Sequence, residues 1–185
     1  RRQRQMCIRD SIYIEGKDYC SMKPEELRKH IAMVPQQVNL FSGTIRENLL
    51  LADPNANDEK LKEALSEAGL GSFLKTLPKG LDSDVGNAGA ALSGGQRQKM
   101  GIARALLSEA QYMIFDEATS SVDPQSEREI WETIGRLSKT RTLIIISHRM
   151  STIQNANCIY VLEKGVVAQR GSHAELMQQG GLYRE

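Results

Sequence analysis

The sequence predicts an α/β protein with a mainly parallel sheet, helices on both faces of that sheet, and an inserted helical subdomain. Two observations carry this prediction. In the second half of the chain, apolar runs such as Tyr112–Asp116 and Thr142–Ile146 alternate with longer segments of helical spacing. Between about residues 44 and 107, helix signals dominate and strand signals are few, as expected for a helical insertion between strands.

The strands are predicted from short apolar runs that turn residues interrupt. In chain order they are expected at residues 12–14, 31–34, 112–116, 142–146, 159–162 and 166–169. Pro35 ends the second of these runs. The third and fourth runs are apolar almost throughout, which predicts that both strands are buried.

The helices are predicted from their caps and from apolar residues at helical spacing. In chain order they are expected from residue 24, at 44–51, 58–68, 73–77, 93–107 and 124–137, and from residue 172. Pro24 takes the favoured first position of its helix, and Thr44 and Ser172 each open a capping box with a glutamate three residues later. Asp123 caps the helix at 124–137, and the segment 79–91 is expected to be a loop.

The composition excludes several classes of protein. Of 185 residues, 40% are hydrophobic and 25% are charged, which fits a globular protein with a core. The net charge is +1 and aromatic residues are only 5%, so we expect no nucleic-acid partner. The longest strongly apolar stretch, residues 143–146, is far too short to cross a bilayer. Cys7, Cys20 and Cys158 are widely spaced, which indicates a reducing compartment and no metal site.

Residues 1–11 differ from the rest of the chain. The segment RRQRQMCIRDS carries four arginines and one acid. It fits either a short basic arm that binds nucleic acid or a non-native leader like an adapter-derived peptide. We favour the leader, and we expect the remaining residues, 12–185, to continue a gene that begins further upstream.

The most specific motif is LSGGQ at residues 92–96. Ser93 and Gln96 form a capping box, while Gly94 and Gly95 leave backbone N–H groups open to close approach. The first turn of a helix combines free N–H donors with the positive end of the dipole, so it favours an anion. An ordinary glycine turn before a helix is the alternative interpretation.

Two adjacent carboxylates, Asp116 and Glu117, follow the apolar run YMIF. Ligands bind at the carboxyl ends of strands in open α/β sheets. One carboxylate can hold Mg²⁺, directly or through water, and the other can polarise an attacking water. A solvated acidic strand end is the alternative.

Two further polar residues follow predicted strands. His148 comes after residues 142–146, and Gln36 comes after residues 31–34 and a proline. A lone histidine is more often structural than functional, and a loop glutamine usually has no function. The neutral carboxamide of Gln36 can nonetheless bind a water in a metal shell and sense phosphate.

Taken in order, these motifs resemble the nucleotide-binding domain of ATP-binding cassette (ABC) proteins over residues 11–185. The segments that match exporter-type domains, which are fused to a membrane-spanning half, are LFSGTIREN (40–48), LPKG (77–80), LSGGQRQ (92–98), DEATSSVD (116–123), SHRMSTI (147–153) and GSHAELMQQGGLY (171–183). The resemblance implies a P-loop NTPase-like fold, ATP and Mg²⁺ as cofactors, and a partial nucleotide-binding domain over residues 12–185.

The resemblance implies catalytic and metal-binding roles for four residues. Glu117 matches the catalytic glutamate that orients or activates water, and His148 matches the switch histidine that contacts the γ-phosphate. Asp116 matches the Walker B aspartate of the Mg²⁺ shell. Gln36 matches the Q-loop glutamine, which contacts Mg²⁺ or its water and couples to the transmembrane part.

The resemblance also implies a head-to-tail dimer that sandwiches two ATP molecules. Ser93, Gly94, Gly95 and Gln96 match the signature that touches the γ-phosphate of ATP held by the opposite subunit. Asp123 matches the D-loop aspartate at the dimer interface. The implied partners are a second nucleotide-binding domain, in a homodimer or a heterodimer, and a transmembrane domain in the same polypeptide at the cytoplasmic face of the plasma (inner) membrane.

The implied function is ATP binding and hydrolysis that power export of a substrate across a membrane. One alternative is a soluble ABC ATPase serving translation or DNA repair, against which residues 40–48 and 77–80 argue. Another is a non-hydrolysing dimerisation module, against which Glu117 and His148 argue.

Two departures from the family pattern matter. The chain has no G-x-x-x-x-G-K-[ST] motif, since the Gly-Lys pair before Gln36 is Gly16-Lys17 followed by Asp18. The family carries this phosphate-binding motif further upstream, so we expect the isolated chain to bind ATP weakly or not at all and to be inactive. Asn87 stands where exporters usually carry a glutamate.

Overall fold

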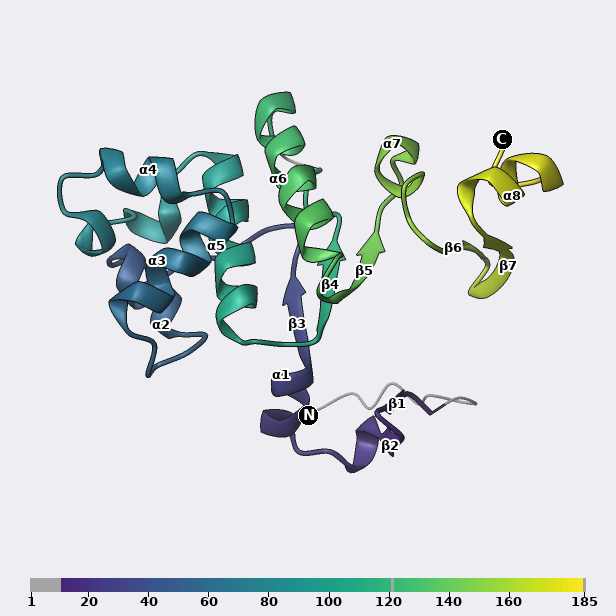
Figure 1. Ribbon diagram of the computed structural model, residues 1–185, viewed down its shortest axis with the longest axis horizontal. Coiled ribbons are helices and arrows are strands. Elements are labelled where there is room, and N and C mark those ends of the chain that lie inside the picture. Colours follow the sequence, from purple (N-terminus) through teal and green to yellow (C-terminus); the bar gives the residue numbers. More distant parts are fainter. Residues whose placement is uncertain (1–10, 121, 185) are drawn as a thin grey trace. The chain divides into compact units, whose positions relative to one another are not determined.

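The computed structural model describes residues 11–120 and 122–184 and divides into two compact units after Ile144 (Figure 1). Apart from Ser11, the predicted leader lies outside the described residues, and so does Ser121. The strands are β1 (Tyr13–Ile14), β2 (Lys17–Asp18), β3 (Ile31–Val34), β4 (Tyr112–Asp116), β5 (Thr142–Ile146), β6 (Ile159–Glu163) and β7 (Val166–Gly171).

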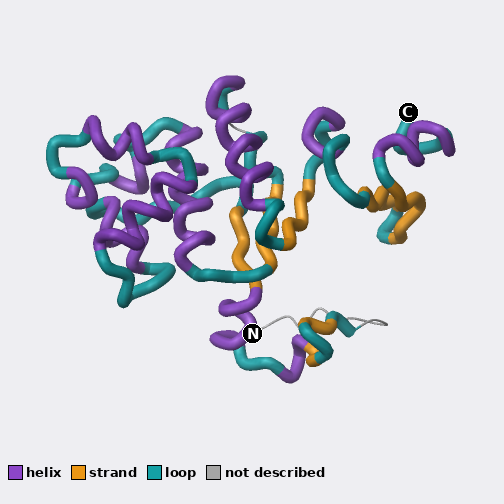
Figure 2. Tube along the Cα trace, in the orientation of Figure 1, coloured by secondary structure: helices purple, strands orange, loops and turns teal. Residues whose placement is uncertain are grey.

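Helices make up most of the regular structure (Figure 2). They are α1 (Pro24–His30), α2 (Ile45–Leu50), α3 (Asp58–Glu67), α4 (Gly71–Thr76), α5 (Gly94–Leu107), α6 (Pro124–Leu137), α7 (Met150–Ile153) and α8 (His173–Gln179). Each predicted helix is present, with ends that move by at most two residues. None of the helices that the structure describes is both long and apolar enough to cross a lipid bilayer.

The central sheet has the strand order β3-β4-β5. β3 and β4 are parallel and in register from Ile31 opposite Tyr112 to Val34 opposite Phe115. The parallel pair and its flanking helices confirm the predicted α/β class. Because parallel strands end at the same edge, the residues that follow β3 and β4 are brought together there.

The core of the first unit lies between the sheet and α5. Val34, Met113 and Phe115 are at most 1% exposed. Burial of β5 was also predicted, and that prediction is wrong, because Ile144 and Ile146 are each 49% exposed. β3 and β5 are both edge strands of this sheet, but α1 and α5 pack on β3, and among the described elements no helix packs as closely on β5.

The elements between β3 and β4, from α2 to α5, are all helices. The side chain of Thr44 caps α2 and forms the predicted capping box with Glu47. α5 contacts α2, α3 and α6 as well as β3, so it is the common support of this part of the fold. Most of its side chains are therefore buried, which explains why residues 100–107 are small or apolar except for Arg104.

The second unit, Ile145–Glu185, is a small hairpin domain. β6 and β7 pair antiparallel, and α8 packs against β7. Ile159, Leu176 and Tyr183 form its core. The side chain of Ser172 opens α8 through the predicted capping box.

An ion-pair cluster joins the helices that follow β3. Arg46 on α2 pairs with Asp58 on α3 and with Asp82, whose Oδ1 accepts a hydrogen bond from Arg46 Nε at 2.7 Å. The hydrogen bonds from Arg46 lower the pKa of both carboxyl groups. The cluster links three segments through one guanidinium.

We expect Arg46→Met to lower stability at pH 7 and to reduce the loss of stability in acid. Both carboxyl pKa values are lowered on folding, so their stabilisation is present above about pH 4 and is lost as the pH falls through the folded pKa values. Urea unfolding at pH 7 and pH 3 measures this, with Lys75→Met, a change at an exposed lysine of α4, as the control. Equal acid sensitivity of wild type and Arg46→Met contradicts the prediction.

Candidate functional site

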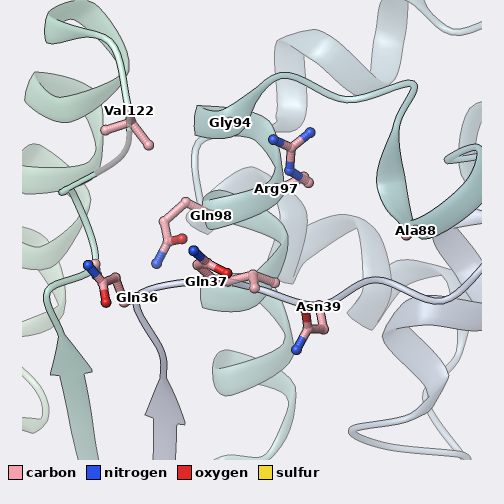
Figure 3. A pocket seen from close by; sticks show the side chains of 10 residues that line it. Gln36, Gln37, Asn39, Ala88, Gly94, Arg97, Gln98 and Val122 are labelled. Carbon is pink, nitrogen blue, oxygen red and sulfur yellow. The ribbon is translucent and has the colours of Figure 1, made fainter.

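A cavity of about 370 Å³ lies beside the carboxyl end of β3 (Figure 3). Four segments of the first unit form its wall: the loop after β3, the turn at Asn87–Gly89, the first turns of α5 and the segment after β4. The lining residues are Gln36, Gln37, Val38, Asn39, Ala88, Gly94, Arg97, Gln98, Ala118 and Val122. The cavity therefore joins the predicted glutamine and the predicted glycine motif.

Gln36 and Glu117 meet at the edge of the sheet. Gln36 Nε2 donates to Glu117 Oε2 at 3.1 Å and to Ser120 Oγ at 3.0 Å. These residues are more than 80 positions apart in sequence, and the parallel pairing of β3 with β4 places them side by side. Ser120 was not predicted, because a serine in a loop carries no distinctive sequence signal.

The backbone at Glu117 is strained. Its φ angle is +46°, in the left-handed region that residues with a side chain seldom adopt. Such conformations persist where the surrounding structure enforces them, and they concentrate at functional sites. The strained turn immediately follows Asp116, the half-buried last residue of β4.

The donors at this edge fit Mg²⁺ held together with a phosphate ligand. Asp116, Glu117 and Gln36 carry hard oxygen atoms, and Mg²⁺ commonly takes one or two carboxylates plus phosphate oxygens and water. Among the described residues, no group of three or more histidine, cysteine, aspartate or glutamate side chains could hold a metal alone. The arrangement therefore suits a shared site better than a closed protein cage.

The glycine motif opens α5 as predicted. Gln96 N donates to Ser93 Oγ at 3.2 Å, and Ser93 N donates to Gln96 Oε1 at 2.8 Å. Gly94 and Gly95 are the first two residues of the helix. Ser93 is exposed and Gly94 lines the cavity, so this end of α5 is accessible.

The start of α5 packs against the start of α6. A Cβ atom on Gly95 would overlap both Cβ and Oγ of Ser126, so the two helices approach too closely for any other residue. Asp123 caps α6, accepting from Gln125 N at 3.1 Å and Ser126 N at 2.9 Å. Hydrogen bonds from Ser126 lower the pKa of Asp123. Gly95 and Asp123 thus lie close together within one chain.

His148 lies in the second unit, between β5 and α7. The neighbouring Ser147 Oγ accepts a hydrogen bond from Arg149 N at 3.0 Å. The role of His148 remains a prediction from the sequence.

Gln98 is a buried polar residue that the sequence analysis missed. Only 4% of it is exposed, and its Nε2 donates to the carbonyl oxygen of Pro35 at 3.0 Å. A signal existed, because Gln98 shares a helix face with the apolar residues Ile102 and Ala105. A glutamine among apolar residues on the buried face of a helix needs a hydrogen-bond partner.

Comparison with known proteins agrees with this geometry. Residues 2–120 match the family model described as ABC transporter. The chain is 44% identical over 174 residues to an "ATP-dependent lipid A-core flippase" of Desulfotalea psychrophila, covering 94% of this chain and 30% of that protein. It is 43% identical to "P-glycoprotein 14" of Caenorhabditis elegans, covering 94% of this chain and 13% of that protein.

A solved structure is also similar. The bacterial Atm1-family ABC exporter with ATP bound superimposes with a TM-score of 0.86 at 37% identity, covering 94% of this chain and 30% of that one. The chain thus spans about 30% of the length of the flippase and of the Atm1-family exporter.

Proposed function

The chain belongs to the ABC transporter family, and from that premise we propose that it is the ATP-binding and ATP-hydrolysing module of an exporter. One observation carries the proposal: Gln36 is hydrogen-bonded to Glu117 directly beside Asp116, at the carboxyl edge of a parallel sheet. These are the side chains that metal-assisted phosphoryl transfer to water requires.

In this proposal the four residues at or beyond the strand ends have separate roles in ATP hydrolysis. Asp116 and Gln36 would hold Mg²⁺, which would neutralise charge on the β- and γ-phosphates. Glu117 orients the attacking water and accepts its proton. His148 contacts the γ-phosphate.

The other predicted residues serve a dimer. Ser93, Gly94, Gly95 and Gln96 supply helix N–H groups and a hydroxyl to the γ-phosphate bound by a second nucleotide-binding domain. Asp123 lies at that interface, which fits its closeness to Gly95. We assign the helical subdomain to residues 44–107.

We further propose that a transmembrane domain belongs to the same polypeptide and that the module works at the cytoplasmic face of the plasma (inner) membrane. The support is the greater length of the flippase and of the Atm1-family exporter, of which this chain matches 30%. A role as a soluble ABC ATPase is disfavoured, because the relatives named above are a flippase, a P-glycoprotein and an exporter.

Phosphate release from ATP tests the proposal. The complete subunit with its proposed transmembrane domain, reconstituted in vesicles, is expected to hydrolyse ATP with Mg²⁺ and to stop when EDTA removes the metal. The 185-residue chain alone is expected to bind ATP weakly or not at all, because it lacks the G-x-x-x-x-G-K-[ST] cradle. Micromolar ATP binding by the 185-residue chain, or an inactive complete subunit, contradicts this.

A further inference from the structure

The loop that carries Gln36 is held by α5 at both of its ends. On one side, Gln98 Nε2 donates to the carbonyl oxygen of Pro35 at 3.0 Å. In Figure 3 the side chain of Gln98 extends from the helix toward the segment of Gln36 and Gln37. The residue immediately before Gln36 is therefore tied to α5 by a buried side chain.

On the other side, Arg104 fixes the end of the same loop. Its Nη1 donates to the carbonyl oxygen of Asn39 at 2.7 Å. Its Nε and Nη2 donate to the backbone oxygen and to Oδ1 of Asn48, at 2.8 and 2.6 Å. Asn48 is 1% exposed and also bonds both backbone groups of Phe41, so the anchor is rigid.

Between these anchors the loop lies directly on the helix. A Cβ atom on Gly101 would come within 2.5 Å of Val38 Cγ2, so this glycine permits the close approach. Gln98, Gly101 and Arg104 are spaced three residues apart, on neighbouring turns of α5. One stripe of the helix thus contacts Pro35, Val38 and Asn39.

The same helix begins at the glycine motif. Ser93 caps α5, and Gly94 lines the cavity that Gln36 and Gln98 also line. α5 holds the loop along one stripe and carries the glycine motif at its first turn. A rigid helix therefore fixes the position of the loop relative to the glycine motif. Gln98 stands nearer to the motif than Arg104 does and touches the residue next to Gln36.

We propose that Gln98 is a positioning residue that, through the Pro35 carbonyl, holds the amide of Gln36 against Glu117. This inference rests on the proposed ATPase function. A residue needed only to fill space at this place would be apolar, because a buried amide costs free energy unless it is hydrogen-bonded. The partner of Gln98 is the loop, and the loop delivers Gln36 to the catalytic carboxylate.

Gln98→Leu in the complete subunit tests the inference, with Thr133→Val as the matched control. Thr133 is also buried, and its Oγ1 donates to Glu129 O at 3.1 Å on α6, away from the loop. We expect Gln98→Leu to lower kcat about tenfold or more with KM for ATP changed less than about twofold, since small misplacements cost large factors in rate. We expect Thr133→Val to retain kcat at a similar loss of thermal stability.

A double variant separates positioning from general damage. If Gln98 acts through Gln36, Gln36→Ala combined with Gln98→Leu loses no more activity than Gln36→Ala alone. In parallel, hydrogen exchange of the amides at residues 36–39 is expected to accelerate about tenfold in Gln98→Leu and to stay unchanged in Thr133→Val.

The outcomes are distinguishable. Additive losses in an active enzyme, or unchanged hydrogen exchange in the loop, overturn the inference and leave the proposed function standing. A wild-type subunit that hydrolyses no ATP contradicts the proposed function, and it also contradicts the catalytic part of this inference.

Discussion

Glu117→Gln is expected to abolish ATP turnover in the complete subunit while ATP binding persists. The glutamine keeps the size of the side chain and an oxygen that accepts from Gln36 Nε2, so the contact at the sheet edge survives. It loses the charge and the ability to accept a proton from water. Because a positioned general base contributes about 10²–10⁴-fold, turnover should fall by a factor in that range.

Phosphate release and ATP binding, measured on the same preparation, check this prediction. In the proposed dimer, in which ATP lies between the two nucleotide-binding domains, the variant should remain dimeric with ATP because the nucleotide is not consumed. Glu132→Gln, the same exchange at an exposed position on α6, is the control and should leave turnover unchanged. Normal turnover in Glu117→Gln would remove this residue from the catalytic role.

Gly95→Ala should have the largest effect on stability. The added Cβ overlaps Cβ and Oγ of Ser126. Ser126 lies on α6, so its Cβ atom cannot move away unless the backbone of α6 moves. Overpacking of this kind costs about 1–3 kcal/mol, and the overlap with a Cβ atom places this case near the upper end. For a chain of this size the melting temperature should drop by roughly 6–12 °C.

A compensating variant makes the test specific. Ser126→Gly removes both overlapping atoms at a cost of about 0.5 kcal/mol in helix propensity and of the side-chain hydrogen bond to Asp123. The double variant should nevertheless be more stable than the two separate losses predict. Gly135→Ala, also on α6, meets nothing within 4 Å and should be neutral or slightly stabilising. Thermal unfolding of the four variants measures these changes in stability. Strictly additive stability losses for Gly95→Ala and Ser126→Gly would contradict the contact between the two residues.

Local signals in the sequence predicted the elements of the site well. The capping box of Ser93 and Gln96 is formed as expected, because it depends on residues three apart. The contact of Gln36 with Glu117 was not predicted, although the sequence placed each residue after a strand of a mainly parallel sheet. The capping box needs only local spacing, whereas this contact also needs β3 and β4 to be neighbours in the sheet.

Other features depend on packing that no local pattern encodes. The closeness of Gly95 to Ser126 requires the crossing of two helices, and the exposure of β5 depends on which strands the helices cover. α7, with four residues, and the strand β2, with two, are too short to show a period. The helix face predicts that Gln98 is buried, but its hydrogen bond to Pro35 depends on the packing of the loop after β3 on α5.

The stripe of Gln98, Gly101 and Arg104 has a consequence for the length of α5. Each residue of an α-helix turns the next by about 100°, so a deletion between Ser93 and Gln98 would rotate the stripe out of phase with the motif. An insertion there would do the same in the other direction. The number of residues between the motif and the stripe is therefore fixed by the screw symmetry of the backbone.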